Sequence, residues 1–296
     1  MPVKPLVSVI TATYNMADYV CEAIDSVLAQ SVPDVQCVVV DDGSTDRTRE
    51  VLARYADDPR VKVLHQENAG QTVSKNRGLA AADGEFIGFC DADDRWRPEK
   101  LAVQLPLLRE TPGVGVVYAD FQCIGPKGED LETPRWTCPS GRITGPLLAD
   151  NFVHFPTVLT RKAVLEEFGG FDERLSMAID YDLWLRVSTR YDFLHVPQVL
   201  VDYRIWGGQM SHRTGERLDN AFRMMESFLE RYPDSVSKAE ADRAWAHTYV
   251  TRAIWHVKEG RPDEARADFG RALGHRPLDR RCWKCLVKWA LRRPLY

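Results

Sequence analysis

The sequence predicts an α/β protein built on a doubly wound, mostly parallel sheet flanked by helices, with a helical extension at the C-terminal end. Short apolar runs rich in β-branched residues alternate with helical patterns through roughly the first 120 residues. Such an alternation is typical of right-handed β–α–β units, whose consecutive strands are parallel. From residue 212 onward the pattern becomes helical throughout.

Each expected element follows from its own run of residues. Strands are expected at Leu6–Ile10, Cys37–Val40, Val61–Leu64, Phe86–Cys90 and Val114–Tyr118. Helices are expected at Ala17–Leu28, Ser44–Tyr55 and Ala69–Ala81. Because ligands of such sheets bind beyond the carboxyl ends of the strands, the functional site is expected there.

Two domains are expected in a chain of this length. Residues 1–211 would form the α/β domain and residues 212–296 the helical extension. A Pro-, Gly- and charge-rich stretch at about 125–145 reads as a long loop. Within the extension, the segment 244–277 resembles one tetratricopeptide-like helical pair.

The composition excludes several classes of protein. A hydrophobic fraction of 44% and a charged fraction of 28% are ordinary for a globular protein, and the net charge of -4 provides no basic field for nucleic acid. The cysteines are scattered, apart from Cys282-x-x-Cys285, which indicates free thiols in a reducing compartment. Neither a signal peptide nor a run of 18 apolar residues is evident, so we expect a cytoplasmic protein without a transmembrane helix.

Two acidic clusters carry the strongest chemical signal. Asp41–Asp46 and Asp91–Asp94 each follow an expected strand. Carboxylates two residues apart at a strand end can converge on Mg²⁺ or Mn²⁺, which prefer oxygen ligands. Either cluster alone could be a solvated turn. Both together, at the ends of strands of one sheet, favour a cation that bridges a diphosphate.

The clusters belong to an ordered set of segments that resembles the family 2 glycosyltransferases of the GT-A fold. The segments are Val7–Asn15, Val38–Asp46, Asn68–Gln71, Asn76–Leu79 and Phe89–Asp94. The match extends over roughly residues 5–211. It implies an inverting, metal-dependent enzyme that transfers a sugar from a nucleotide-diphosphate donor, which we expect to be UDP-linked, to a hydroxyl acceptor. A growing polysaccharide, a glycan or a lipid-linked saccharide would be the acceptor. It also implies a nucleotide-binding half at about 1–120 and an acceptor half at about 121–211.

The same resemblance implies the donor site. The first strand end would line the base and ribose pocket, and Asp41 or Asp42 would bind the base or ribose, with Asp41 favoured because it ends the strand. Asp93 would be the main ligand of Mn²⁺ or Mg²⁺, with Asp91 on the cation or the ribose and Asp94 orienting either one. The expected donor-binding residues are Thr11, Thr13, Tyr14, Asp41, Asp42, Lys75, Asn76, Asp91, Ala92 and Arg204.

The sequence departs from the family pattern at three places. Lys75 stands where an arginine commonly contacts base or phosphate; it keeps the charge but loses the planar fork. An exposed helix face is the other interpretation of Lys75 and Arg77. Trp206 stands where the family often has a histidine near metal or diphosphate, and Ile179 replaces a glutamate.

The catalytic base is implied by the segment around residue 180. Ile179–Arg186 resembles the family's Glu-Asp-x-Asp-Leu-x-Leu-Arg sequence, which maps the general base onto Asp180. An apolar neighbour at Ile179 would raise the pKa of this carboxyl by desolvation. Asp182 is the competitor, and we expect it to cap the helix or pair with Arg186 at i+4.

Three further residues have open roles. Arg204 could meet the diphosphate as a charged donor. His212 could replace the missing histidine or be solvated, and His154 could face the acceptor or be a core histidine.

The C-terminal segment Arg281–Arg293 mixes two tryptophans with lysines and arginines. As a helix it could lie in a membrane interface, which would make the protein peripheral on the inner face of the plasma membrane. The alternative is a terminal helix that packs its tryptophans on the domain.

The alternative function is a catalytically degenerate sugar-nucleotide-binding module with a helical tail that recruits a partner. The joint presence of Asp91, Asp93 and Asp180 favours the enzyme, because a binding module needs no base. A nucleotidyltransferase ranks last, since its Gly-rich phosphate loop ahead of a lysine is missing. No nucleic-acid partner is expected.

Overall fold

The computed structural model describes residues 4–134, 138–209 and 214–291. Contacts divide the chain into two compact units. The first unit comprises Met1–Arg142 and Phe152–Gln209, and the second comprises Ile143–Asn151 and Met210–Tyr296. The segment 143–151 was expected in the first domain but belongs to the second unit, because its helix packs against another helix of that unit.

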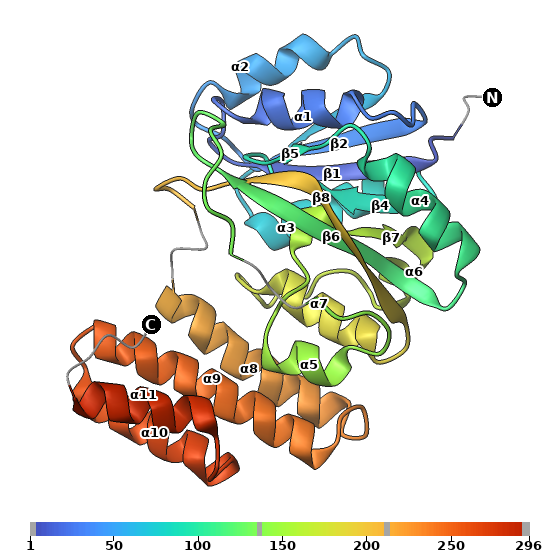
Figure 1. Ribbon diagram of the computed structural model, residues 1–296. Coiled ribbons are helices and arrows are strands. Elements are labelled where there is room, and N and C mark those ends of the chain that lie inside the picture. Colours follow the sequence, from blue (N-terminus) through green and yellow to red (C-terminus); the bar gives the residue numbers. More distant parts are fainter. Residues whose placement is uncertain (1–3, 135–137, 210–213, 292–296) are drawn as a thin grey trace. The chain divides into compact units, whose positions relative to one another are not determined.

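The first unit is built on one eight-stranded sheet with the strand order β3-β2-β1-β4-β7-β6-β8-β5 (Figure 1). The strands are β1 Val7–Thr13, β2 Val35–Asp41, β3 Val61–His65, β4 Phe86–Phe89, β5 Arg95–Trp96, β6 Val114–Ile124, β7 Leu159–Arg161 and β8 Asp192–Arg204. Strands β1 to β4 are mutually parallel where they pair, and β8 is parallel to β6. Strand β7 is antiparallel to β4 and β6, and β5 is antiparallel to β8.

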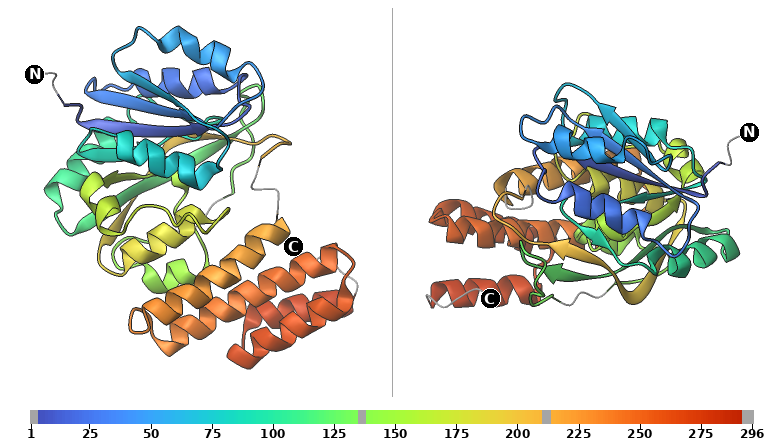
Figure 2. Two further views of the ribbon diagram at one scale, coloured as in Figure 1. Left: turned by 180° about the vertical axis from the view of Figure 1, so that it is seen from behind. Right: turned by 90° about the horizontal axis from the view of Figure 1, so that it is seen from above.

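Helices cover both faces of this sheet, which explains why its central strands are almost uniformly buried. The helices of the first unit are α1 Val20–Leu28, α2 Thr48–Leu52, α3 Gln71–Ala81, α4 Lys100–Glu110, α6 Lys162–Glu167 and α7 Ile179–Ser188. Val7 and Val9 of β1 pack in one core cluster with the buried side chains of α1 and α4. Helix α3 covers the other face and approaches β1 so closely that a Cβ at Gly78 would lie 2.5 Å from Ile10 Cγ2. Figure 2 shows α1 and α3 on opposite sides of β1.

The order of strands locates the functional edge. From β1 the chain adds β2 and β3 on one side and then β4 on the other. This reversal is a topological switch point, and ligands bind in the crevice that it opens beyond the strand ends.

The second unit is helical. Its helices are α5 Thr144–Ala149, α8 Thr214–Arg231, α9 Lys238–Lys258, α10 Pro262–His275 and α11 Arg280–Ala290. Helices α9 and α10 form the pair predicted at 244–277, and Gly260 with φ +72° lies in the turn between them. Arg252 on α9 makes a bidentate contact with the Asp268 carboxylate on α10, at 2.7 and 2.9 Å. Phe269 lies in a core of small side chains that α9, α10 and α11 share. Over the described ranges, no helix combines the length and apolar character needed to cross a bilayer.

Candidate active site

Asn15 organises the loops at the carboxyl ends of β1 and β2. It has φ 55°, in the left-handed region that asparagine tolerates. Its Oδ1 accepts hydrogen bonds from the backbone N–H groups of Thr45 at 2.7 Å and Asp46 at 3.2 Å. Its own backbone N–H donates to Ser44 Oγ at 2.9 Å. Because Ser44 to Asp46 serve this junction, α2 begins only at Thr48, later than predicted.

Asp42 fixes the loop that precedes α3. Its Oδ1 accepts from Gln66 Nε2 at 2.7 Å and from the N–H of Ala69 at 2.8 Å. Its Oδ2 accepts from the N–H of Gly70 at 2.9 Å. Gly70 is the N-cap of α3, with φ +90°. The Asp42 carboxylate therefore sets the start of α3.

Asp41 ends β2 and is almost fully buried. Its Oδ1 accepts from the N–H of Ser44 at 3.1 Å, and its Oδ2 lies 2.9 Å from His65 Nδ1. Both aspartates thus shape the edge of the sheet where the sequence predicted base and ribose contacts.

The remaining residues predicted for the pocket differ in accessibility. Thr11 is fully buried and Thr13 is buried, while Tyr14 is 44% exposed. Ala92 is buried as well. Of the residues at the end of β1, Tyr14 is the one that offers its ring to solvent.

Three carboxylates follow β4. Asp91 Oδ1 lies 3.3 Å from Lys75 Nζ. Asp93 Oδ2 accepts from the indole Nε1 of Trp206 at 2.8 Å. Asp94 Oδ1 accepts from the N–H of Arg204 at 2.9 Å, whereas its buried Oδ2 has no hydrogen-bond partner among the described residues.

The surroundings of this triplet disfavour the charged form of two of its carboxyl groups. Burial, followed by the charge of Asp91, raises the pKa of Asp93. Burial and the charges of Asp93 and Asp91 raise the pKa of Asp94 well above its usual value. Crowded carboxylates that are partly removed from water disfavour their own charge, and a cation reverses that effect. The all-oxygen donor set suits Mn²⁺ or Mg²⁺.

Arg204 takes a different role from the one predicted. Its side chain is buried, its Nε donates to the carbonyl of Asp93 at 2.8 Å, and its Nη1 donates to the carbonyls of Gly125 at 3.2 Å and Pro126 at 3.1 Å. Its Nη2 pairs with Glu22. Because these bonds engage both Nη atoms and Nε, the guanidinium supports the backbone of the acidic triplet and is not aimed at a diphosphate.

Lys75 lies in the site and not on an exposed helix face. Its side chain is buried, and its Nζ lies 4.2 Å from the centre of the Phe155 ring and 3.3 Å from Asp91. Its neighbour Arg77 instead donates to the carbonyl of His65 at 3.0 Å at the surface.

Asn76 also departs from its predicted role. Its Nδ2 donates to the carbonyl of Phe171, and its Oδ1 accepts from the N–H of Phe171, both at 2.9 Å. This amide fixes the backbone of Phe171, which follows Gly169 and Gly170, to α3. We therefore assign it to the framework of the site and not to donor binding.

Asp180 lies in the first turn of α7 and is half-buried. Ile179 before it is buried in the core, and Ala178 at the N-cap has φ 57°. Asp182 pairs with Arg186 at 2.7 Å, as predicted for an i+4 pair. Arg186 also donates to the carbonyl of Gly170 at 2.8 Å, so Asp182 belongs to a structural network.

Helix α3 connects the acidic triplet with the start of α7. Lys75 contacts Asp91 from this helix. One turn earlier, Gln71 Nε2 donates to the carbonyl of Ser176 at 2.8 Å and Thr72 Oγ1 donates to that of Leu175 at 2.7 Å. The segment that leads into Asp180 is thereby attached to the helix that contacts Asp91.

Comparison with known sequences decides the family, because residues 8–168 match Glycosyl transferase family 2. The chain belongs to glycosyltransferase family 2. It is therefore a glycosyltransferase, as the sequence motifs predicted.

Relatives with assigned names are glycosyltransferases or polysaccharide synthases as well. The chain is 32% identical over 236 residues to an uncharacterized glycosyltransferase of Rickettsia typhi, covering 77% of this chain and 73% of the relative. It is 45% identical over 159 residues to a putative teichuronic acid biosynthesis glycosyltransferase of Bacillus subtilis, covering 53% of this chain and 56% of the relative. It is 29% identical over 232 residues to the hyaluronan synthase of Pasteurella multocida, covering 77% of this chain but 23% of the synthase.

Solved structures confirm the GT-A fold. A mannosyltransferase from Pyrobaculum calidifontis, in complex with GDP-Man and Mn²⁺, aligns with a TM-score of 0.66 at 20% identity, over 98% of this chain and 81% of that chain. TarS of S. aureus, in complex with UDP-GlcNAc, aligns with a TM-score of 0.60 at 20% identity, over 88% of this chain and 90% of that chain.

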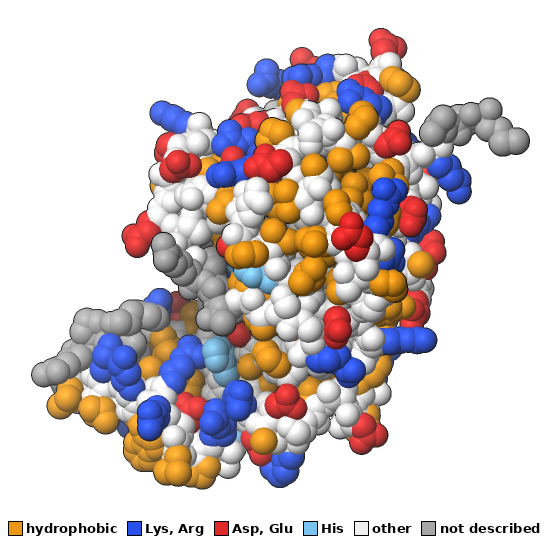
Figure 3. Space-filling view, turned by 45° about the vertical axis from the view of Figure 1, so that its right-hand side comes forward, with side chains coloured by type: hydrophobic (Ala, Val, Ile, Leu, Met, Phe, Trp, Pro, Cys, Tyr) orange, Lys and Arg blue, Asp and Glu red, His pale blue; other side chains and the backbone are white. Residues whose placement is uncertain are grey.

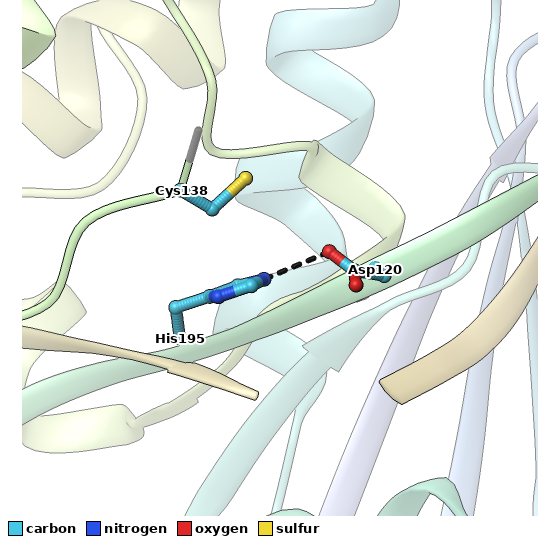
Figure 4. A group of neighbouring side chains, drawn as sticks. All are labelled: Asp120, Cys138 and His195. Carbon is cyan, nitrogen blue, oxygen red and sulfur yellow. Dashed lines mark hydrogen bonds and ion pairs between the residues drawn. The ribbon is translucent and has the colours of Figure 1, made fainter. Parts of the chain in front are cut away.

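One polar cluster of this family 2 glycosyltransferase was not predicted from the sequence. Asp120, Cys138 and His195 point toward one another (Figure 4). His195 Nε2 lies 2.8 Å from Asp120 Oδ1, and burial together with the Asp120 charge raises the pKa of Cys138 to about 11. The three residues are far apart in the sequence and form no motif, so only the paired strands reveal them.

The two histidines with open roles are separated by the structure. The ring of His154 packs edge-on against Phe121 with their centres 4.2 Å apart. Burial lowers the pKa of His154 to about 4, which favours the core interpretation. His212 lies outside the described residues.

Proposed function

We propose that this family 2 glycosyltransferase transfers a sugar from a nucleotide-diphosphate donor, UDP-linked in our assignment, to a hydroxyl of a saccharide or lipid-linked saccharide, with inversion at the anomeric carbon. The attachment of both Asp91 and the segment before Asp180 to α3 is the observation that carries this proposal. The UDP-GlcNAc and GDP-Man in the complexes of the structural neighbours, and the polysaccharide synthases among the relatives, support the classes of donor and acceptor.

In this proposal the donor lies along the carboxyl edge of β1, β2 and β4. Tyr14 and the Asp41–Asp42 turn contact the nucleotide, and Lys75 supplies positive charge beside Asp91. Asp91 and Asp93 hold Mn²⁺ or Mg²⁺, which neutralises charge on the departing diphosphate when bound. Trp206 and the Arg204 backbone N–H orient Asp93 and Asp94.

Asp180 acts as the general base. The acceptor oxygen forms a bond to the anomeric carbon while the bond from that carbon to the diphosphate oxygen breaks. The acceptor proton passes to the Asp180 carboxylate. Attack and departure on opposite faces of the sugar give inversion, and most of the acceleration comes from positioning both substrates and removing the proton.

The alternative is a sugar-nucleotide-binding module without catalysis. Two departures from the family pattern favour it: Ile179 is buried in the core, and the Trp206 indole cannot ligate a metal. A module of this kind would bind donors as well as the enzyme does but would not turn them over.

The Asp180→Asn substitution distinguishes the glycosyltransferase from the binding module. We expect transfer to fall by about 10²- to 10⁴-fold, the usual contribution of a general base, with donor binding retained. Donor binding is measured by thermal shift with UDP-, GDP- and dTDP-sugars, with and without Mn²⁺. Asp57→Asn, at an exposed position, is the control and should leave both transfer and donor binding unchanged.

Full turnover by the Asp180→Asn variant would reject Asp180 as the base. Binding of donors by the wild-type protein without any transfer to a panel of saccharide acceptors would favour the binding module. A thermal shift that Mn²⁺ does not alter would reject the assignment of Asp91 and Asp93 to the cation.

A lipid-linked acceptor would bring the enzyme to a membrane surface, and we propose that α11 makes that contact. Trp283, Val287 and Leu291 follow at i+4 spacing and are 49%, 53% and 58% exposed. Lys284 and Lys288 follow each of the first two, and the helix sequence contains no acidic residue. Figure 3 shows apolar side chains gathered beside basic ones at the lower end of the second unit. An apolar stripe flanked by cations suits the interface of an anionic bilayer.

Vesicle flotation tests this contact. The wild-type protein should float with phosphatidylglycerol vesicles and not with phosphatidylcholine vesicles, and Trp283→Ser with Val287→Ser should abolish flotation. Leu131→Ser, at an exposed leucine of the first unit, should leave flotation unchanged. A wild-type protein that does not float with anionic vesicles would refute the membrane contact without affecting the assignment of Asp180.

A further inference from the structure

Asp120, Cys138 and His195 bring three different metal-ligating atoms together (Figure 4). Asp120 lies on β6 and His195 on β8, two strands that pair in parallel. One carboxylate oxygen, one thiol sulfur and one imidazole nitrogen all lie within 4.8 Å of one another. Modest side-chain rotations would bring all three to bonding distance of a single cation.

The framework holds Cys138 beside the two strands. The contacts that fasten the segment 138–141 are Tyr118 Oη to the carbonyl of Pro139, the N–H of His195 to Ser140 Oγ at 2.9 Å, and the mutual backbone bonds of Gly141 and Phe193 at 2.7 and 3.0 Å. The strands that carry Asp120 and His195 therefore also position the third side chain. The arrangement is part of the fold and not a chance approach of surface groups.

The donor set differs from that of the acidic triplet. Oxygen, sulfur and nitrogen ligands together suit Zn²⁺ or Co²⁺, whereas the carboxylates after β4 offer oxygen alone. Three protein ligands leave one position of a tetrahedron for water. The side chains of Asp120 and His195 are 42% and 13% exposed, so a cation can enter from solvent.

This cluster is separate from the donor edge. Asp120 precedes Ile124 by four residues on β6, and Ile124 pairs with Arg204, which binds Asp94. At about 3.3 Å per residue, the cluster lies on the order of 13 Å along the strand from that point. A cation here would not contact the diphosphate.

We propose that Asp120, Cys138 and His195 form a zinc site that fixes the segment 138–141 to β6 and β8. On binding, the Cys138 thiol releases its proton to solvent and bonds through sulfur. His195 bonds through Nε2 with its proton on Nδ1, and Asp120 exchanges its contact with His195 for one with the cation. No electron transfer is involved, and the site is independent of the proposed glycosyl transfer.

Cobalt substitution tests the site in the chain of 296 residues. After treatment with chelator, the protein is titrated with Co²⁺ and followed by absorbance. A four-coordinate site with one thiolate should give visible d–d bands and a near-ultraviolet sulfur-to-cobalt band at one Co²⁺ per chain. Zn²⁺ should displace both bands and raise the melting temperature.

Matched variants assign the ligands. Cys138→Ser should remove the sulfur-to-cobalt band, while Cys21→Ser, at another half-buried cysteine, should keep it. His195→Gln and Asp120→Asn should each weaken Co²⁺ binding by more than the roughly 10- to 100-fold that loss of an outer partner costs. Asp93→Asn and the Cys282→Ser, Cys285→Ser double variant should keep the band.

The opposite results overturn the proposal. A chain without a thiolate band would contain only the contact between Asp120 and His195 beside a thiol that binds no cation. A band that survives Cys138→Ser, or that the Cys282→Ser, Cys285→Ser variant loses, would place the cation elsewhere. Because the readout is spectroscopic, it does not depend on whether Asp180 is the base.

Discussion

Trp206, where the family often has a histidine, still contacts the acidic triplet, but in a different role. An imidazole can ligate a metal, whereas an indole N–H can only donate. Here it donates to Asp93 Oδ2, and its ring lies 5.6 Å from that of Tyr19. The residue that cannot hold a cation thus orients the carboxylate proposed to do so.

His154 makes stability depend on pH. Burial lowers its pKa to about 4, below the value of about 6.5 in an unfolded chain. The unfolded state therefore binds the proton more tightly, so the stabilisation is complete above pH 6.5 and is lost as the pH falls toward 4. Between pH 7 and 5 the free energy of unfolding should fall by about 2 kcal/mol through this group.

Urea unfolding of the wild-type protein and His154→Asn at the two pH values measures this contribution. The variant should lose less stability than the wild type over the interval. An equal loss in both proteins would mean that the His154 ring is accessible to water and protonates freely in the folded state.

The role of Arg204 could not be read from single residues in the sequence. Arg204 was predicted as a charged donor, but the bonds of its side chain depend on the pairing of β8 with β6 and β5. The same holds for Asn76, whose partner Phe171 is remote in sequence. By contrast, the i+4 pair of Asp182 and Arg186 needs only helix geometry, and it was predicted correctly.

Among the elements, the loop around Gly43 is the most restrictive at the donor edge. Gly43 has φ +74°, and a Cβ at this position would lie 2.7 Å from the backbone nitrogen of Asn68. Gly43→Ala should cost about 2 kcal/mol or more, because the left-handed conformation alone costs about 1–2 kcal/mol and backbone cannot move aside cheaply. The loss should appear in chemical denaturation and should also weaken donor binding.

Gly113→Ala is the matched control. A Cβ at Gly113 would meet nothing within 4 Å, and its φ lies outside the left-handed region. This variant should be neutral or slightly more stable, since alanine restricts the unfolded chain. Equal effects of the two substitutions would show that the Gly43 loop yields to the added carbon.

Element prediction succeeded where burial follows the chain locally. The strands β1, β2 and β4 consist almost entirely of buried residues, and helix α1 buries Val20, Ala23, Ile24 and Val27 at helical spacing. It failed where long-range contacts decide. The antiparallel strands β5 and β7 are too short to carry a pattern, and α5 packs against α9, far along the chain.

On the scale of the whole molecule, each unit has a hydrophobic core of its own. Phe269 is fully buried in the core of the second unit. Phe269→Ala should cost about 3–5 kcal/mol, the usual range for a buried phenylalanine. Hydrogen exchange should then accelerate in α9 to α11 and stay unchanged in β1 to β4.

Phe86→Ala provides the reciprocal test, because Phe86 is fully buried in the core of the first unit. It should accelerate exchange in the sheet and leave α9 to α11 protected. Acceleration across both units in either variant would mean that the chain unfolds as a single cooperative body.

Ala178, two residues before Asp180, has an unusual backbone conformation. It is an alanine in the left-handed region, at a cost of about 1–2 kcal/mol relative to an ordinary conformation. The surrounding contacts must stabilise this strained conformation, and they thereby fix the orientation of the first turn of α7. A glycine at position 178 would remove the backbone strain. It would also increase the conformational freedom of the backbone beside Asp180, the carboxylate proposed to accept the proton. At this position the stability of the fold and the orientation of the Asp180 carboxylate are therefore opposed.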